Sequence, residues 1–434
     1  MRDTESELEA APESQPRSAP PARLDLPDRM TVWAVFLVSV ALALAFPAAE
    51  AATFFFTPKR PFHAEGSWLE TLPMVAAGGL IAIWIFIFWS LIGSFLNVVV
   101  YRLPLGQSVV LGGSRCPRCA SPIKWHDNLP VIGWLNLNGR CRSCDLPIAA
   151  RYPIVESICA GLGTAVYSRE LLSGGANLPG RIPDSLPSGV LRLFPSPAPD
   201  LVGLSLYHCV MLCVLLVWGL IAWDGRRVPG RSILWVLGVA VALPVVFPSL
   251  HPLGLWGGPG TVVDDWLGQG LAVSVAGGVA GLLCGLSLQG LLGRLLRGDA
   301  SGRTGQPLTP PHTLGIGLAL VGIVCGWQGM LGTTVLLLAA CLVHVLIWSA
   351  LMDWPAVPAE LLLVLATFVH LCAWRQLAGA LGPWWPESPT PACLAVPMAM
   401  VLALSWALVA ITPVSGRRQS QTEPTPGHPG DQAA

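Results

Sequence analysis

Residues 115–144, RCPRCASPIKWHDNLPVIGWLNLNGRCRSC, determine how this chain is organised, because this polar stretch interrupts a sequence made mostly of long apolar runs. It contains two C-x-x-C pairs, and their spacing is typical of a zinc ribbon, in which each pair presents two thiolates to one tetrahedral ion. Four sulfur ligands leave no open position for water, so such a metal stabilises a small fold and performs no chemistry. We therefore predict a structural zinc site whose ligands are Cys116, Cys119, Cys141 and Cys144.

The composition of the whole chain is that of a polytopic membrane protein. Its 434 residues are 53% hydrophobic and only 12% charged, and the mean hydropathy is +0.61. A soluble domain carries about twice that charged fraction. The formal net charge is zero, so the overall charge gives no indication of a nucleic-acid partner.

Apolar runs near the length that crosses a bilayer, roughly 20 residues, recur along the chain. We therefore expect an all-α polytopic membrane protein with about ten transmembrane helices in the lipid bilayer and a small four-cysteine insert. The runs cover residues 32–52, 74–101, 153–171, 203–223, 231–249, 266–292, 314–330, 332–352, 357–376 and 393–412.

Basic residues gather on one side of the predicted membrane. Alternating ten spans places the insert, residues 102–152, on the same side as an arginine-rich set: Arg226, Arg227, Arg231, Arg294, Arg297, Arg303, Arg417 and Arg418. By the positive-inside rule this side is cytoplasmic. In the reducing cytosol two C-x-x-C pairs more often bind a metal than form disulfides, so a disulfide framework is the weaker alternative.

The insert and its flanks carry three further motifs. GSFLNVVVYRLP stands at 93–104, WHDNLPVIGWL at 125–135 and ARYPIVE at 150–156. Together with the cysteine pairs, these motifs make residues 93–156 resemble the amino-terminal domain of prepilin peptidases, the type IV leader peptidases.

This resemblance implies a location and an activity. Prepilin peptidases are multi-pass proteins of the bacterial inner membrane, and they are aspartic endopeptidases. They remove the leader from type IV prepilins and pseudopilins after a glycine on the cytoplasmic side. Many also methylate the new amino terminus, so the resemblance implies S-adenosylmethionine as a second cofactor beside zinc.

Aspartic proteolysis needs two carboxyl groups that share a proton. In the family that this chain resembles, one aspartate ends a helix ahead of a proline and the other closes a G-x-G-D motif. Asp224 ends an apolar run ahead of Pro229, although closer to the proline than is usual in the family. The counterpart of the second motif is Gly315-Ile316-Gly317, where Leu318 occupies the place of the aspartate.

A second aspartate repeats the pattern of the first. Asp353 precedes Val357-Pro358 as Asp224 precedes Val228-Pro229, and each follows a long apolar run. We therefore consider Asp224 and Asp353 as a displaced catalytic pair. The alternative is that both are independent polar stops, since helix ends commonly carry an aspartate before a proline turn.

The resemblance also suggests a division of the chain. The two ends are rich in proline and polar residues and are predicted to be disordered. The expected units are a tail at 1–28, an extra helix and loop at 29–73, a prepilin-peptidase-like domain at 74–156, a membrane domain at 157–377, an extra helix at 378–412 and a tail at 413–434.

Two functions remain open from the sequence. The chain is an active prepilin-type peptidase, or it is a divergent relative without proteolytic activity that serves as a zinc-bearing membrane scaffold or as a methyltransferase only. The missing aspartate at position 318 is the reason to keep the second interpretation. A transporter is disfavoured because charged residues are scarce within the predicted spans.

Overall fold

The computed structural model describes residues 30–41, 44, 68–111, 113–179, 181, 198–255, 266–295, 313–348, 357–382 and 392–411. Asp353 and both predicted tails lie outside these residues. Within them every regular element is helical, and the insert contains two isolated β-bridges, Arg115–Pro122 and Arg140–Pro147. The expected all-α fold with a four-cysteine insert is therefore confirmed for the part of the chain that is described.

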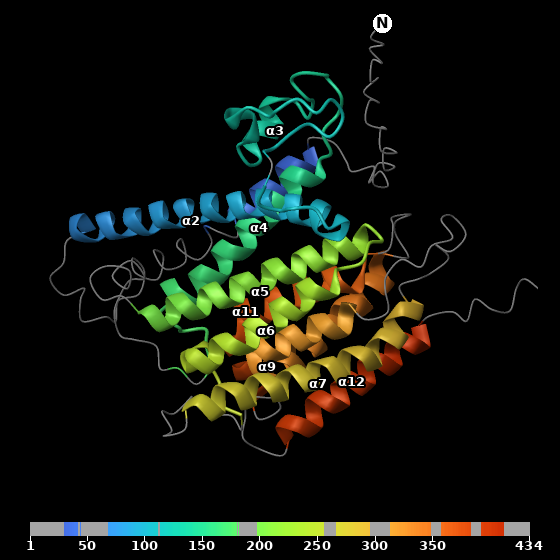
Figure 1. The fold of residues 1–434 in the computed structure, drawn as a ribbon. Coiled ribbons are helices and arrows are strands. Elements are labelled where there is room, and N and C mark those ends of the chain that lie inside the picture. Colours follow the sequence, from blue (N-terminus) through green and yellow to red (C-terminus); the bar gives the residue numbers. More distant parts are fainter. Residues whose placement is uncertain are drawn as a thin grey trace, which may run out of the picture.

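The long helices form a bundle with the insert at one side (Figure 1). They are α2 (Trp68–Arg102), α4 (Arg151–Tyr167), α5 (Pro199–Trp223), α6 (Gly230–Val246), α7 (Trp266–Leu295), α9 (Thr313–Val343), α11 (Ala359–Leu381) and α12 (Ala392–Ile411). Short helices connect them: η2 (Leu103–Leu105), η3 (Trp125–Asn128), α3 (Ile132–Asn136), η4 (Ser168–Leu172), η6 (Pro248–Leu250) and η7 (His344–Trp348).

Five of these helices are long and apolar enough to cross a membrane. This agrees with a membrane protein, whereas the number of about ten spans stays a prediction. The five segments are Ala76–Leu105, Pro199–Trp223, Gly268–Gln289, Thr313–Leu346 and Ala359–Ala380.

Helix α9 reverses direction at Gly326, whose φ of 73° and ψ of 172° are not helical. Neighbouring residues of α7 contact both of its halves. A Cβ on Gly285 would lie 2.5 Å from the Cα of Gly315, and the Sγ of Cys284 lies 3.9 Å from the Oγ1 of Thr334. In a straight helix residues 315 and 334 would be about 28 Å apart, so the chain folds back. The two runs predicted at 314–330 and 332–352 are thus two antiparallel legs as far as residue 348, where the described part ends, and the turn falls earlier than expected.

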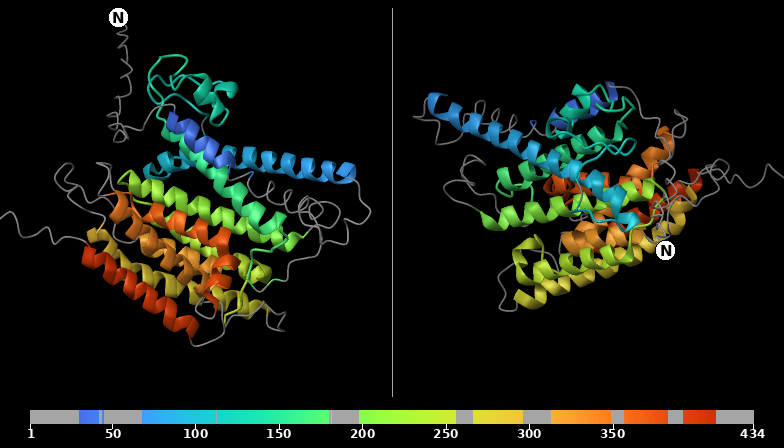
Figure 2. Two further views of the ribbon diagram at one scale, coloured as in Figure 1. Left: turned by 180° about the vertical axis from the view of Figure 1, so that it is seen from behind. Right: turned by 45° about the horizontal axis from the view of Figure 1, so that its top comes forward.

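Helix α9 is the centre of the bundle. It packs against α5, α6, α7, α11 and α12, and most of its residues are buried. Helices α2 and α4 pack against each other beside this bundle. A further helix, Met30–Ala41, lies along α4 (Figure 2), where a Cβ on Gly161 would lie 3.1 Å from the Cβ of Ser39.

The two ends of the bundle differ in which helices begin or end there. Asp224, at the end of α5, pairs with Arg151, at the start of α4 next to the insert. Thr313, at the start of α9, pairs with Glu360, at the start of α11. The end of α5 and the starts of α9 and α11 therefore lie at the end of the bundle that faces the insert. We call this end the insert-side end. The turn of α9 lies at the opposite end.

Candidate functional site

The four patterned cysteines form one cluster. Their sulfur atoms all lie within 4.8 Å of one another, and the Sγ atoms of Cys116 and Cys144 are 4.0 Å apart. A tetrahedron with Zn–S bonds of about 2.3 Å has edges of about 3.8 Å. The donor set and its spacing therefore fit one zinc ion.

Each cysteine pair lies in a knuckle of the same conformation. The N–H of Cys116 donates to the carbonyl of Ser121 at 3.0 Å, and the N–H of Cys141 donates to that of Leu146 at 2.9 Å. The fifth residue of each knuckle has a positive φ, 58° at Ala120 and 55° at Asp145. This repeat turns the amide groups and thiols of each pair toward a common point, as a metal knuckle requires.

The thiols of the cluster differ in acidity. The hydroxyl and the backbone of Ser121 hydrogen-bond the sulfur of Cys119 and lower the pKa of that thiol to about 6. The N–H of Leu146 lowers the pKa of Cys144, but burial and hydrogen bonds to the other three thiols outweigh it and raise this pKa to about 12. Four crowded thiols resist ionising together because their charges repel, and a cation removes this repulsion.

Two contacts stabilise the insert, one within it and one between it and α4. Arg142 donates two hydrogen bonds to Asp127, at 2.7 and 2.6 Å, and these hold the pKa of the Asp127 carboxyl below its ordinary value. The buried carboxylate of Glu156 on α4 accepts the N–H of Val131 at 2.7 Å. Glu156 belongs to the ARYPIVE motif, so this motif joins the insert to the membrane helices.

Asp224 caps the end of α5 and is paired with Arg151, the first residue of α4. Only 11% of the Asp224 side chain and 18% of the Arg151 side chain are exposed. Arg151 also belongs to ARYPIVE. The predicted catalytic aspartate is therefore held by a residue of the motif-bearing domain, and its partner in the described structure is a cation instead of a second carboxylate.

The place of the expected G-x-G-D motif is apolar. Leu318 is fully buried, and a Cβ on Gly281 of α7 would lie 2.2 Å from its carbonyl oxygen. Position 318 is thus packed between α9 and α7. It offers no carboxyl group to Asp224.

A buried carboxyl that the sequence analysis did not single out lies at the same end. Glu360, in the first turn of α11, accepts a hydrogen bond from the hydroxyl of Thr313. The residue that faces it on α5 is Gly219, whose Cβ would lie 3.4 Å from the carbonyl carbon of Glu360. Asp224 follows five residues later, which turns it by about 140° around the helix. The structure therefore directs Asp224 toward α4, away from Glu360.

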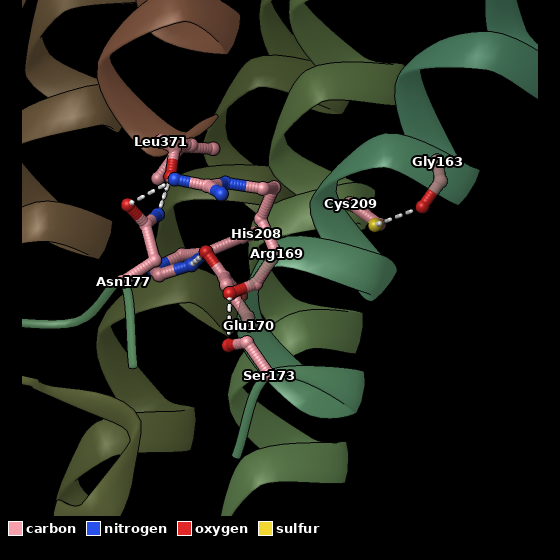
Figure 3. A network of polar contacts seen from close by, with 8 residues as sticks. All are labelled: Gly163, Arg169, Glu170, Ser173, Asn177, His208, Cys209 and Leu371. Atoms are coloured by element: carbon pink, nitrogen blue, oxygen red, sulfur yellow. Dashed lines mark hydrogen bonds and ion pairs between the residues drawn. The ribbon is translucent and has the colours of Figure 1, made fainter. Parts of the chain in front are cut away.

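A second polar cluster lies toward the opposite end, and Figure 3 shows it. The Nδ1 of His208 on α5 lies 2.7 Å from the Oε1 of Glu170 in η4, and both side chains are fully buried. The neighbouring Arg169 donates to the carbonyl of Cys372 at 2.8 Å, and Asn177 donates to that of Leu371 at 2.5 Å. These contacts tie the end of α4 to α11.

The pair of Glu170 and His208 was not predicted from the sequence. Glu170 lies at the end of an apolar run, where a charged residue is an ordinary stop, and one histidine within an apolar helix is not a motif. This pair is one of the few places in the described structure where ionisable side chains are buried in the membrane domain. A polar partner within the same helix would lie three or four positions from the histidine and could be found from the sequence. Here the partner of His208 comes from another helix, so the sequence gives no such signal.

Comparison with known proteins supports the resemblance. The profile of the bacterial peptidase A24 N-terminal domain matches residues 87–169. The prepilin leader peptidase/N-methyltransferase of Myxococcus xanthus (strain DK1622) is 51% identical over 92 residues, which are 21% of this chain and 28% of that protein. The protein of the same name from Aeromonas hydrophila is 39% identical over 106 residues, 19% of this chain and 37% of that protein.

A third relative carries a different name. The type 4 prepilin-like proteins leader peptide-processing enzyme of Escherichia coli O78:H11 is 39% identical over 118 residues, 23% of this chain and 40% of that protein. The chain thus covers less than half of each of these relatives. No solved structure matches it. The similarity to prepilin peptidases is confirmed, and residues 87–169 carry it.

Proposed function

We propose that this chain, which carries a bacterial peptidase A24 N-terminal domain, is a membrane aspartic endopeptidase that removes leaders from type IV prepilin-like or pseudopilin proteins. The observation that carries the proposal is the pair of Asp224 and Arg151. It joins the predicted catalytic aspartate on α5 to the ARYPIVE motif of the matched domain.

The proposed reaction is the hydrolysis of one peptide bond. One carboxylate takes a proton from water as the water oxygen bonds to the carbonyl carbon, and a second, protonated carboxyl gives its proton to the carbonyl oxygen. The first carboxyl then gives the proton it took from water to the amine nitrogen, the C–N bond breaks, and the second carboxylate takes back a hydroxyl proton as the new carboxyl group forms. We assign Asp224 as one carboxyl group. Asp353 stays the proposed second one, as the repeated Asp-x3-Val-Pro pattern predicts.

The zinc site has a structural role in the proposed enzyme. Cys116, Cys119, Cys141 and Cys144 would bind one Zn²⁺, and the ion would supply cross-links that an insert with so small a core lacks. The insert would then hold Arg151 and Glu156 in position at the start of α4. No step of the hydrolysis passes through the metal.

We further propose that the chain lies in the bacterial inner membrane with the insert in the cytoplasm. The arginine-rich loops on the insert side support this orientation. Trypsin tests it, since the insert carries Lys124 and several arginines. Cleavage within 102–152 is expected in inside-out vesicles and not in intact spheroplasts; the reverse pattern would overturn the orientation.

Methyl transfer is the second proposed activity. The names of the Myxococcus and Aeromonas relatives include N-methyltransferase, and S-adenosylmethionine would be the methyl donor. The test is the mass of the processed substrate. A gain of one methyl group at the new amino terminus that depends on added S-adenosylmethionine is expected, and an unmodified terminus would remove this part of the proposal.

A proteolytically inactive role is the second candidate, and one observation favours it. Leu318 occupies the place of the second family aspartate and is fully buried. In that case the chain would act as a zinc-bearing scaffold for prepilin-like proteins or as a methyltransferase only.

Coexpression with a prepilin-like substrate separates the two candidates. The active enzyme shortens the substrate by its leader, and Asp224→Asn and Asp353→Asn each prevent this. A wild-type chain that binds the substrate and leaves it uncut would favour the scaffold. Cleavage that survives both substitutions would reject this pair of aspartates.

A further inference from the structure

We propose that Cys159 and Cys213 form a two-thiol site for a soft monovalent metal ion of the Cu(I) class, separate from the zinc cluster and from Asp224. Cys159 lies on α4 and Cys213 on α5, and their Sγ atoms are 4.0 Å apart. Metal binding at this site would be independent of the proposed peptidase activity.

A small cavity lies beside this pair of thiols. Its lining comes from α2, α4 and α5 and includes Trp89, Cys159, Gly163, Cys209 and Cys213 beside leucine side chains. Sulfur atoms are the metal-ligating side-chain atoms of this lining, and the other groups are apolar or aromatic. The site is therefore unsuited to a hydrated ion, which needs oxygen or nitrogen partners.

The absence of a side chain at Gly163 lets the indole of Trp89 pack against α4 beside the cavity. A Cβ on Gly163 would lie 2.3 Å from the Cγ of Trp89, so any other residue would displace the ring that closes one wall. Cys209, one helical turn before Cys213, has its Sγ 3.8 Å from the carbonyl oxygen of Gly163 (Figure 3). Its thiol is thus directed to the backbone of α4, and Cys159 and Cys213 are left as the ligand pair.

The spacing of the two sulfur atoms suits a bridging metal ion. Two metal–sulfur bonds of about 2.3 Å span about 4.6 Å when they are in line and about 3.8 Å at a tetrahedral angle. The observed 4.0 Å lies between these limits. Neither sulfur has to move far to bind one ion.

The chemistry of the ligands selects the ion. Thiolates favour soft ions, whereas Ca²⁺ and Mg²⁺ require oxygen ligands. Zinc in a structural site takes four ligands, and this pair offers two. Cu(I) is the soft ion that two thiolates satisfy. Binding replaces two S–H protons with one Cu⁺, so two protons leave and the site carries one negative charge.

The competing explanation is that these cysteines are ordinary packing residues, because a thiol in an apolar helix behaves as a small hydrophobe. Packing alone predicts no metal affinity. A metal titration therefore distinguishes the two explanations without any assay of peptidase activity.

The test is an anaerobic titration of the purified full-length, zinc-loaded protein with Cu(I) in competition with the chelator bicinchoninate. The wild-type protein is expected to withhold one Cu(I) from the chelator. Cys159→Ser and Cys213→Ser are each expected to weaken this binding at least tenfold. Cys341→Ser is the matched control, since Cys341 is a buried cysteine of α9, and it should bind as the wild type does.

Zinc content measured in the same samples locates the copper. Copper bound at the proposed site leaves zinc in place, and its binding persists in Cys116→Ser. Copper that displaces zinc and no longer binds in Cys116→Ser is bound by the insert, and this result overturns the proposal. Equal affinity in the wild type and in both Cys159→Ser and Cys213→Ser overturns it as well. Phenylarsine oxide, which bridges two neighbouring thiols, gives a second readout if one variant folds poorly. Its single adduct should span Cys159 and Cys213, and an adduct at other cysteines only would contradict the site.

Discussion

Arg151, the first residue of α4, is paired with Asp224, the residue that caps α5. The contact connects the domain that carries the family motifs to the helix that carries the predicted catalytic aspartate. It lies at the insert-side end, where the second carboxylate of the proposed reaction must also be placed.

Arg151→Gln is expected to lower the free energy of unfolding by about 1.5–3 kcal/mol, because the partly buried Asp224 loses a charged hydrogen-bond donor. Denaturant titration of the purified protein in detergent measures this. Arg226→Gln is the control, since Arg226 makes an exposed contact of 3.5 Å with the carbonyl of Tyr101 and lies 5.7 Å from the centroid of the same residue's ring. Its expected change is below about 1 kcal/mol. Equal losses in the two variants would mean that the Arg151 pair contributes no more than a surface contact.

Cys116→Ser and Cys141→Ser are each expected to remove zinc from the purified protein, because each takes one sulfur from the cluster. Elemental analysis should find about one zinc per wild-type chain and less than a tenth of that in the variants. Cys284→Ser, at a free cysteine of α7 outside the cluster, should keep the metal. Stoichiometric zinc in Cys116→Ser would reject the four-cysteine assignment.

Gly93→Ala is expected to cost about 1–3 kcal/mol of stability. A Cβ at this position would lie 2.8 Å from the backbone Cα of Glu156, so α2 and α4 would have to separate. Gly79→Ala in the same helix meets nothing within 4 Å, and it should be neutral or stabilising by up to about 1 kcal/mol. Thermal unfolding in detergent compares them; a Gly93→Ala protein as stable as Gly79→Ala would contradict the close packing.

Glu170→Gln is expected to destabilise the membrane domain by about 3–5 kcal/mol, because it leaves the fully buried His208 without its charged partner. The leader-removal rate per folded molecule should stay within about twofold, since the pair lies far from Asp224 along α4 and α5. Unfolding and cleavage are measured on the same preparation. A loss of cleavage with unchanged stability would assign Glu170 to the reaction instead.

The parts of this protein that follow from local sequence could be predicted. Cys116, Cys119, Cys141 and Cys144 could be grouped because a C-x-x-C pair forms a knuckle by itself, and Asp224 could be chosen because a polar residue at the end of an apolar helix lies at the membrane surface. The reversal within 314–352 followed from the length of the apolar run. The position of the turn could not be predicted. Gly326 has a positive φ, and the turn is placed there by the packing of both legs on the same stretch of α7.

The parts that depend on packing between helices could not be predicted. Arg151 and Asp224 are separated by 73 residues, and only the packing of α4 on α5 brings them together. The same holds for Glu170 and His208, and for Cys159 and Cys213, whose side chains look like ordinary members of apolar runs. In each case the sequence contains both residues, but nothing near either of them indicates the other.

The proposed peptidase activity is tested by cleavage of a purified prepilin-like substrate by the purified full-length protein in lipid vesicles, with the product identified by mass. A single cut after the glycine that ends the leader is expected, and the rate should be at least about 100-fold lower in Asp224→Asn, because one acid–base group contributes about that much. Cleavage by Asp224→Asn at the wild-type rate, or a wild-type protein that leaves the substrate intact, would contradict it.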